Sequence, residues 1–265
     1  MSAVASARMP YAIRAFRYWL VVYSRTWRGT VTTSVLNPVL FLAAMGLGLG
    51  TYVDKSHSSA LGGLDYVVFL APGLMAGTAM QSGAIEAMWP VMASIKWTKQ
   101  YHAMMATPLR VVDIVAGHFL FMASRLLLTS SIFLAVATLF GAVTSSWALA
   151  AVPAAVLTGM AFATPIAAFA SSRTQERGAF AAINRFVLIP MFLFSGTFFP
   201  VSQLPGWLQP IAYVTPLWHG VELCRNLALG TATVAASVGH VLYLSAFVVA
   251  GVVLSIHFYE KRLAY

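Results

Sequence analysis

The stretch Phe194–Leu227 decides how this chain folds, because it is apolar but repeatedly interrupted by proline. It reads FSGTFFPVSQLPGWLQPIAYVTPLWHGVELCRNL, with Pro200, Pro205, Pro210 and Pro216. A proline inside a helix removes a backbone hydrogen bond and kinks the helix. Irregular backbone at membrane depth is tolerated only where protein or a water-filled cavity surrounds it. We therefore expect a re-entrant segment at 200–232: two short helices that enter the outer leaflet, turn around Pro205–Gly206 or Pro210, and return. The alternative is an external aromatic-rich loop that lies on the headgroups.

The composition on either side of this stretch is that of an integral membrane protein. The 265 residues are 60% hydrophobic and only 9% charged, with a mean hydropathy of +0.80, whereas soluble domains carry about 25% charged residues. The formal net charge is +9, but the basic residues fall in short clusters between apolar spans, so a nucleic acid partner is not expected. A single cysteine, Cys224, excludes an internal disulfide framework.

Residues 8–28 have the pattern of an amphipathic helix. At 100° per residue, Arg14, Arg17, Arg25 and Arg28 share one face, and aromatic residues lie opposite. This pattern is typical of a helix in the membrane interface, with arginines towards anionic headgroups. We expect residues 1–29 to form a cytoplasmic interfacial helix; an amphipathic helix on a soluble partner is the alternative.

The remaining residues, 30–265, predict one all-α transmembrane domain. A spanning helix needs about 20 mostly apolar residues. Six segments are predicted as transmembrane helices: 31–50, 66–93, 114–141, 148–170, 183–199 and 234–257. Basic residues gather before the first span, in the links after the second and fourth, and in the tail, so these parts and both termini are expected on the cytoplasmic side.

Enzymatic chemistry has no motif to support it. No lysine follows a glycine anywhere in the sequence, so the chain lacks a P-loop for ATP, and neither a zinc-protease nor a serine-hydrolase motif is present. His219 and Glu222 form an isolated i, i+3 pair, which we interpret as local hydrogen bonding rather than a metal site. The sequence predicts no catalytic residue, metal or cofactor in this chain.

Two charged residues stand inside predicted spans. Glu86 lies in the second span and Arg125 in the third, where a lone charge costs about 2.5–3.5 kcal/mol. Because consecutive spans are antiparallel, the two side chains can pair. Such a pair either fixes helix packing or takes part in substrate passage.

The cytoplasmic link 95–113 contains KQYHAMMATPL, a potential helix that Pro108 ends or kinks. A rigid helix here can transmit movement from a soluble partner into the membrane. On physical grounds alone, an inert connector explains it equally well.

These features together resemble the membrane subunit of type-2 ABC exporters, the ABC-2 permease family. The resemblance rests on ATPL at 106–109 and on the opening stretch, with its small residue–Gly, Phe–Pro, Leu–Pro and Pro–Leu pairs. The segments FLAPGLMAGTAMQSGAIEAMW and FMASRLLL are most similar to the branch of lipo-oligosaccharide (nodulation-factor) exporters, next to the daunorubicin exporter permeases. His102 stands where many of the family have a glutamate.

The resemblance implies two groups of site residues. A coupling helix at 95–109 would contact the ATPase through Lys99, Tyr101, His102, Met105, Thr107, Pro108 and Leu109. A pair of external re-entrant helices would close the exit, with a motif of Ser195, Gly196, Pro200, Pro205, Pro216, His219, Glu222 and Arg225.

It also implies the assembly and the activity. Two ATP-binding chains, which hold ATP and Mg, would join this chain and a second permease copy, identical or paralogous, in the bacterial plasma (inner) membrane. The exporter would move an amphipathic molecule outward: a glycolipid, a polysaccharide precursor or a hydrophobic drug. A secondary transporter or channel that needs no ATPase is the alternative, although the sequence shows no internal repeat of the kind such transporters carry.

Overall fold

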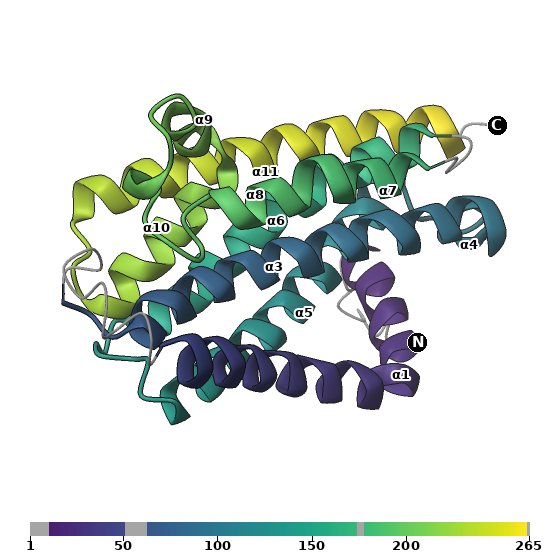
Figure 1. Ribbon diagram of the computed structural model, residues 1–265. Helices are drawn as coiled ribbons and strands as arrows, with labels where there is room; N and C mark the ends of the chain where they lie inside the picture. Colours follow the sequence, from purple (N-terminus) through teal and green to yellow (C-terminus); the bar gives the residue numbers. More distant parts are fainter. Residues whose placement is uncertain (1–10, 51–62, 174–177, 264–265) are drawn as a thin grey trace.

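The computed structural model describes residues 11–50, 63–173 and 178–263, and all regular structure in these ranges is helical (Figure 1). Five helices are long and apolar enough to cross a membrane: Tyr11–Gly46, Tyr66–Trp97, Val111–Leu139, Ala148–Ser172 and Val234–Leu263. The all-helical membrane class predicted from composition is therefore confirmed.

The first helix joins two elements that the sequence separated. Helix α1 (Tyr11–Leu42) continues into the π-helix η1 (Ala43–Leu49), so the expected interfacial helix and the expected span 31–50 form one element. Figure 1 shows α1 bent into two limbs, with its N-terminal limb at the same end of the molecule as the short helix α4 (Gln100–Met105). The single Gly29 between the two parts does not end the helix, because one glycine costs only about 1 kcal/mol.

The next elements follow the predicted spans closely. Helix α3 (Tyr66–Met92) continues into η2 (Ala93–Trp97), and the short α4 (Gln100–Met105) leads to α5 (Val111–Leu139). Lys99, at φ 50°, is in the left-handed region and redirects the chain between η2 and α4. At the start of α5, the Arg110 backbone N–H donates to Asp113 at 3.0 Å, which caps the helix. The coupling segment expected at 95–109 therefore contains the end of the π-helix η2, the six-residue helix α4 and the turn that follows it.

Helix α6 (Ala148–Ser172) is the central element, because it packs against α3, α5, α10 (Pro216–Leu229) and α11 (Val234–Leu263). Its sequence is rich in alanine, and small residues allow close approach of membrane helices. At the crossing of α3 and α6, a Cβ on Gly83 would overlap the carbonyl oxygen of Gly159. The two helix backbones therefore touch directly at this point.

The fifth predicted span is shorter than expected. Helices α7 (Ala179–Ile183), η3 (Asn184–Leu188) and α8 (Ile189–Phe194) form one apolar helical segment of 16 residues. At 1.5 Å per residue it is about 24 Å long, less than the roughly 30 Å of a hydrocarbon core. It ends before Gly196, which has φ 82°, so the expected continuation to residue 199 is wrong. A sixth crossing here stays a prediction.

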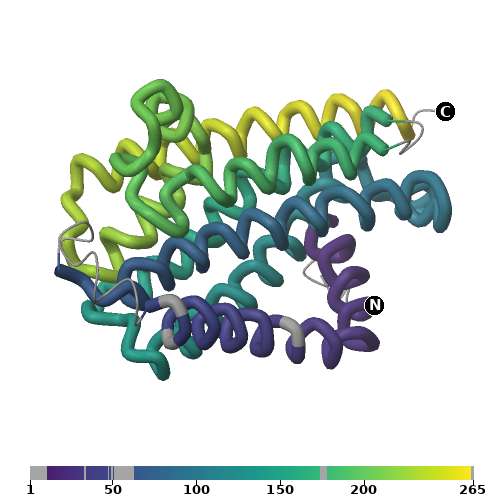
Figure 2. The backbone as a smooth tube through the Cα atoms, viewed as in Figure 1, coloured from purple at the N-terminus to yellow at the C-terminus, as the bar shows by residue number. Residues whose placement is uncertain are grey.

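The proline-rich stretch contains the turn η4 (Val201–Gln203), the short α9 (Gln209–Val214) and α10 (Pro216–Leu229), before α11 (Val234–Leu263). Helices α9 and α10 follow each other here, and the chain turns between them at Thr215, not around Pro205–Gly206 or Pro210. The entry of this segment into the membrane stays a prediction. Pro210 lies in the first turn of α9, where its missing N–H breaks no helical hydrogen bond. Figure 2 shows α9 outside the bundle and α10 against it.

The helix ends gather at two opposite ends of the molecule. Helix α4, the start of α7, the C-terminal end of α11 and the N-terminal limb of α1 lie at one end, and α10 and the α5–α6 turn lie towards the other (Figures 1 and 2). The basic links therefore share one end, as the charge pattern requires. We call this the α4 end; its cytoplasmic location stays a prediction.

Candidate functional site

The motif that the resemblance assigns to the exit is held together by Arg225, a buried side chain on α10. Its Nε donates to the carbonyl of Phe69 at 3.3 Å, and its Nη2 donates to the carbonyl of Gly196 at 2.7 Å. Nη1 forms an ion pair with Glu222 at 2.9 Å, and the guanidinium lies 3.9 Å from the centre of the Phe69 ring. One side chain thus connects α10, α3 and the segment that follows α8.

Other motif residues shape the backbone around Arg225. Ser195, which is buried, shares a 2.8 Å hydrogen bond with the Thr215 hydroxyl. The Thr215 hydroxyl also accepts from the backbone N–H of Trp218 and caps α10, whose first residue is Pro216. Pro200 precedes η4, and the exposed Pro205 accepts hydrogen bonds from the next turn. The motif is a folded cap at the end opposite α4.

His219 pairs with a residue that the sequence analysis did not select. Its Nδ1 lies 2.8 Å from Nδ1 of His240 on α11, and its ring stacks on Tyr243. Burial, together with His240, lowers the pKa of His219 to about 4. The expected local hydrogen bond between His219 and Glu222 is therefore wrong. Glu222 forms its ion pair with Arg225 instead. The available signal in the sequence was His240 itself, a lone histidine within a predicted span.

No cluster of three or more metal-ligating side chains occurs among the residues that the structure describes. The contact between His219 and His240 links α10 to α11.

Glu86 and Arg125 are brought together between α3 and α5. Glu86 Oε1 and Arg125 Nη2 are 3.0 Å apart, and both side chains are 19% exposed. The guanidinium also lies 4.8 Å from the centre of the Tyr23 ring on α1, so the pair links three helices. Beside it is a polar cavity of about 210 Å³ between the same helices. Its hydroxyl and amide side chains come from Thr30, Ser34, Asn37, Thr78, Gln81, Ser82, Thr129 and Ser130.

We expect the loss of either charge to destabilise the bundle. Removing one partner of a buried pair costs about 3–5 kcal/mol, and the partial exposure here reduces that to the lower part of the range or below. Glu86→Gln and Arg125→Gln should each lower the unfolding temperature of the purified protein. The double variant Glu86→Arg/Arg125→Glu should recover part of the loss, although it gives up the Tyr23 contact. If both single variants unfold like the unmodified protein, the pair does not support packing.

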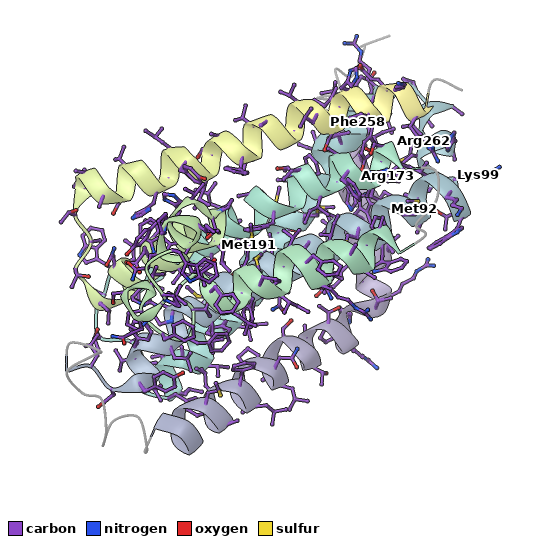
Figure 3. All side chains as sticks on the ribbon, turned by 45° about the horizontal axis from the view of Figure 1, so that its top comes forward. Met92, Lys99, Arg173, Met191, Phe258 and Arg262 are labelled. Carbon is purple, nitrogen blue, oxygen red and sulfur yellow. The ribbon has the colours of Figure 1, made fainter. Side chains whose placement is uncertain are left out.

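A second cavity is almost wholly apolar and has a volume of about 830 Å³. It lies between α6, the α7–α8 segment, α9 and α11, and extends to the start of α10. Its lining includes Phe162 and Ile166 of α6, Met191 of α8 (labelled in Figure 3), Ile211 of α9 and Phe247 of α11. Ligand pockets in proteins have volumes of about 300–1,000 Å³, so this space is large enough for the apolar part of a sizeable molecule.

The segment 95–109, for which a coupling role is expected, has one face inside the protein. Tyr101 on α4 is fully buried, and its hydroxyl shares a 2.7 Å hydrogen bond with Nδ1 of His118 on α5. Its ring also contacts Trp19 on α1 and Tyr259 on α11. Burial raises the pKa of the Tyr101 phenol, which keeps it protonated. Tyr101 therefore anchors α4 to three long helices and does not offer a surface to another protein, contrary to our expectation.

The other expected coupling residues are at least partly accessible. Lys99, Thr107 and Pro108 are exposed. His102, Met105 and Leu109 are half-buried. The accessible face of this link is therefore made by the ends of α4 and the residues that follow it. His118, the buried partner of Tyr101, was not selected from the sequence, although it is a lone histidine in an apolar span.

The five long apolar helices and the Glu86–Arg125 ion pair between two of them are features of a helical membrane protein. The sequence profile of the ABC-2 type transporter family matches residues 14–229. This chain therefore belongs to the ABC-2 type transporter family, as its permease component, and the resemblance seen in its motifs is confirmed.

Curated relatives extend the match to nearly the whole chain. The chain is 31% identical over 252 residues to Nodulation protein J of Sinorhizobium fredii, 29% identical over 252 residues to that of Rhizobium meliloti, and 31% identical over 252 residues to that of Bradyrhizobium diazoefficiens. Each alignment covers 92% of this chain and 94% of the relative.

Proposed function

We propose that this chain is the permease of an ATP-driven exporter that moves an amphipathic substrate out of the cytoplasm or the inner leaflet. The observation that carries the proposal is the structure of α4, a short helix with an accessible side and a tyrosine fixed in the bundle. A displacement of α4 by a partner must move Tyr101, and Tyr101 contacts α1, α5 and α11. Movement outside the membrane is thereby transmitted to the spans.

The partners of the proposed complex follow from what this chain lacks. Because the sequence has no P-loop, ATP and Mg would be bound by two copies of a separate ATP-binding protein. A second permease copy, identical or paralogous, would complete the path. The complex would lie in the bacterial inner membrane with both termini in the cytoplasm, which agrees with the basic links at the α4 end. Family membership favours this function over a secondary transporter or channel.

The substrate class is inferred from the apolar cavity. Its lining side chains provide an environment for acyl or other apolar groups, and it reaches α9 and the first turn of α10. A glycolipid, a polysaccharide precursor with a lipid anchor, or a hydrophobic drug has a group that fits such a space. An ion or a small polar solute has no apolar group that would fit this cavity.

Cross-linking to the ATP-binding protein tests the coupling role. A cysteine at the exposed Thr107 should cross-link to the partner in the purified complex, and ATP hydrolysis should appear only when the partner is present. The native Cys224 is the sole cysteine of the sequence and is buried, so background reaction should be low. Tyr101→Cys is the matched control, since this position is inaccessible. Cross-linking only through Lys261 near the C-terminus would contradict the assignment.

Filling the apolar cavity tests the substrate class. Met191→Trp should lower substrate-stimulated ATP hydrolysis of the reconstituted complex about tenfold, because the larger ring occupies the space. Leu242→Trp, on an exposed face of α11, is the control and should leave the rate unchanged. Equal rates in both variants would place the substrate path elsewhere, and the cavity would then hold only membrane lipid.

A further inference from the structure

The α4 end of the molecule contains a basic cavity of about 600 Å³ beside the expected coupling segment. Three segments far apart in the sequence build it: the η2–α4 link, the last turn of α6 and the last turns of α11. The basic cavity is lined by Ile95, Lys96, Lys99, His102, Ser171, Ser172, Phe258, Lys261 and Arg262. Figure 3 shows Lys99, Phe258 and Arg262 close to the same end, with Arg173 nearby.

The described lining of this basic cavity is positively charged. Among the residues that the structure describes, Lys99, Lys261 and Arg262 bring positive charges to the lining, and no carboxylate belongs to it. The nearest acidic residue along α11, Glu260, is exposed and does not line the cavity. Cations gathered in one concave space raise the local concentration of anions. The site is therefore suited to an anionic ligand.

A polar atom at the basic cavity is also left without a partner. Nδ1 of His102 is buried and makes no hydrogen bond within the described structure. Buried polar groups are normally satisfied, and an exception calls for an explanation such as a bound ligand or water. Oxygen atoms of an anion, or of a group attached to it, can supply the missing partner.

The depth of the basic cavity matches the headgroup layer. Helix α11 has 30 residues and is about 45 Å long, so its last turns extend beyond a hydrocarbon core of about 30 Å. Trp89 and Trp97 near the same end are stacked and about half exposed, as tryptophans at a membrane interface are. Phe258 and Ile95 add an apolar wall to the charged lining. A free anion would not require such a wall, whereas a lipid has apolar groups that can pack against it.

We propose that this basic cavity binds the phosphate of an anionic phospholipid from the adjacent leaflet. Lys99, Lys261 and Arg262 contact the phosphate oxygens, and Phe258 packs against the glycerol and the first methylene groups. Because Lys99 precedes α4 and the other two cations are on α11, the bound headgroup ties the coupling segment to the last span. The proposal does not depend on the nature of the exported substrate.

Thermal unfolding of the full-length protein in detergent tests the proposal. The probes are a short-chain phosphatidylglycerol, the matching phosphatidylcholine, and inorganic phosphate. The phosphatidylglycerol should raise the unfolding temperature by at least about 3 °C near saturation, and the other two should not. The variant Lys99→Gln/Lys261→Gln/Arg262→Gln should lose this shift. Arg14→Gln/Arg17→Gln/Arg25→Gln, which removes three exposed charges from α1, should retain it.

A single substitution keeps the test decisive if the triple variant does not fold. Lys261→Gln changes one exposed side chain and should raise the probe concentration at half-maximal shift several-fold. An unchanged shift in the triple variant, or no shift in the unmodified protein, would overturn the proposal. An equal shift with inorganic phosphate would assign the basic cavity to free phosphate. If phosphatidylglycerol gives no shift but the triple variant co-purifies with less ATP-binding protein, the cavity is a protein-docking surface instead.

Discussion

Arg225→Ala should destabilise this protein more than any other single substitution considered. It leaves two carbonyl groups, on Phe69 and Gly196, without their donor and Glu222 without its counter-charge. Removing one partner of a buried hydrogen-bonded ion pair costs about 3–5 kcal/mol, against a total stability of about 5–15 kcal/mol for a typical domain. We expect the cap formed by residues 195–215 to detach from α3 and α10, with loss of most monodisperse protein on size-exclusion chromatography.

Two variants make this result specific. Arg225→Lys keeps a positive charge for Glu222 but cannot reach all three acceptors from one ammonium group, so it should have intermediate stability. Arg185→Ala removes an exposed arginine and should behave like the unmodified protein. The role assigned to Arg225 would be abandoned if Arg225→Ala and Arg185→Ala unfolded at the same temperature.

Gly83→Ala should also have a large effect, although it adds only one methyl group. The new Cβ would overlap the carbonyl oxygen of Gly159, and neither helix backbone can yield without moving the other. Overpacking of a tight core costs about 1–3 kcal/mol. Because α6 contacts most of the bundle, a displacement of α3 from α6 should also lower ATP hydrolysis by the complex.

Gly239→Ala is the matched control for this substitution. Gly239 is also within a long helix, α11, but nothing lies within 4 Å of a Cβ placed on it. The change should leave stability unchanged or raise it by up to about 1 kcal/mol, the difference in helix propensity between the two residues. If both glycine variants show the same unfolding temperature, close contact at Gly83 does not limit stability.

The sequence alone determined the class of the protein and the approximate position of its helices. Hydropathy and the spacing of charges are local properties, and the cost of exposing polar groups to lipid leaves few alternatives. For the same reason Glu86 and Arg125 could be considered as partners, since antiparallel consecutive spans bring such residues to neighbouring surfaces. The motif in Phe194–Leu227 also indicated the family before any fold was known.

Only the tertiary structure decided the direction in which individual side chains point and which residues they contact. The Tyr101 side chain is buried in the helix bundle and not exposed on α4. His219 contacts His240 and not Glu222. The basic cavity is lined by three segments that are far apart in the sequence. These outcomes depend on how far each helix is rotated and how closely it packs. Direct backbone contacts, such as that between Gly83 and Gly159, fix both quantities, and they involve residues that are distant in the sequence. Local patterns carry no information about that rotation, so the partners of buried polar groups appear only once the helices are packed.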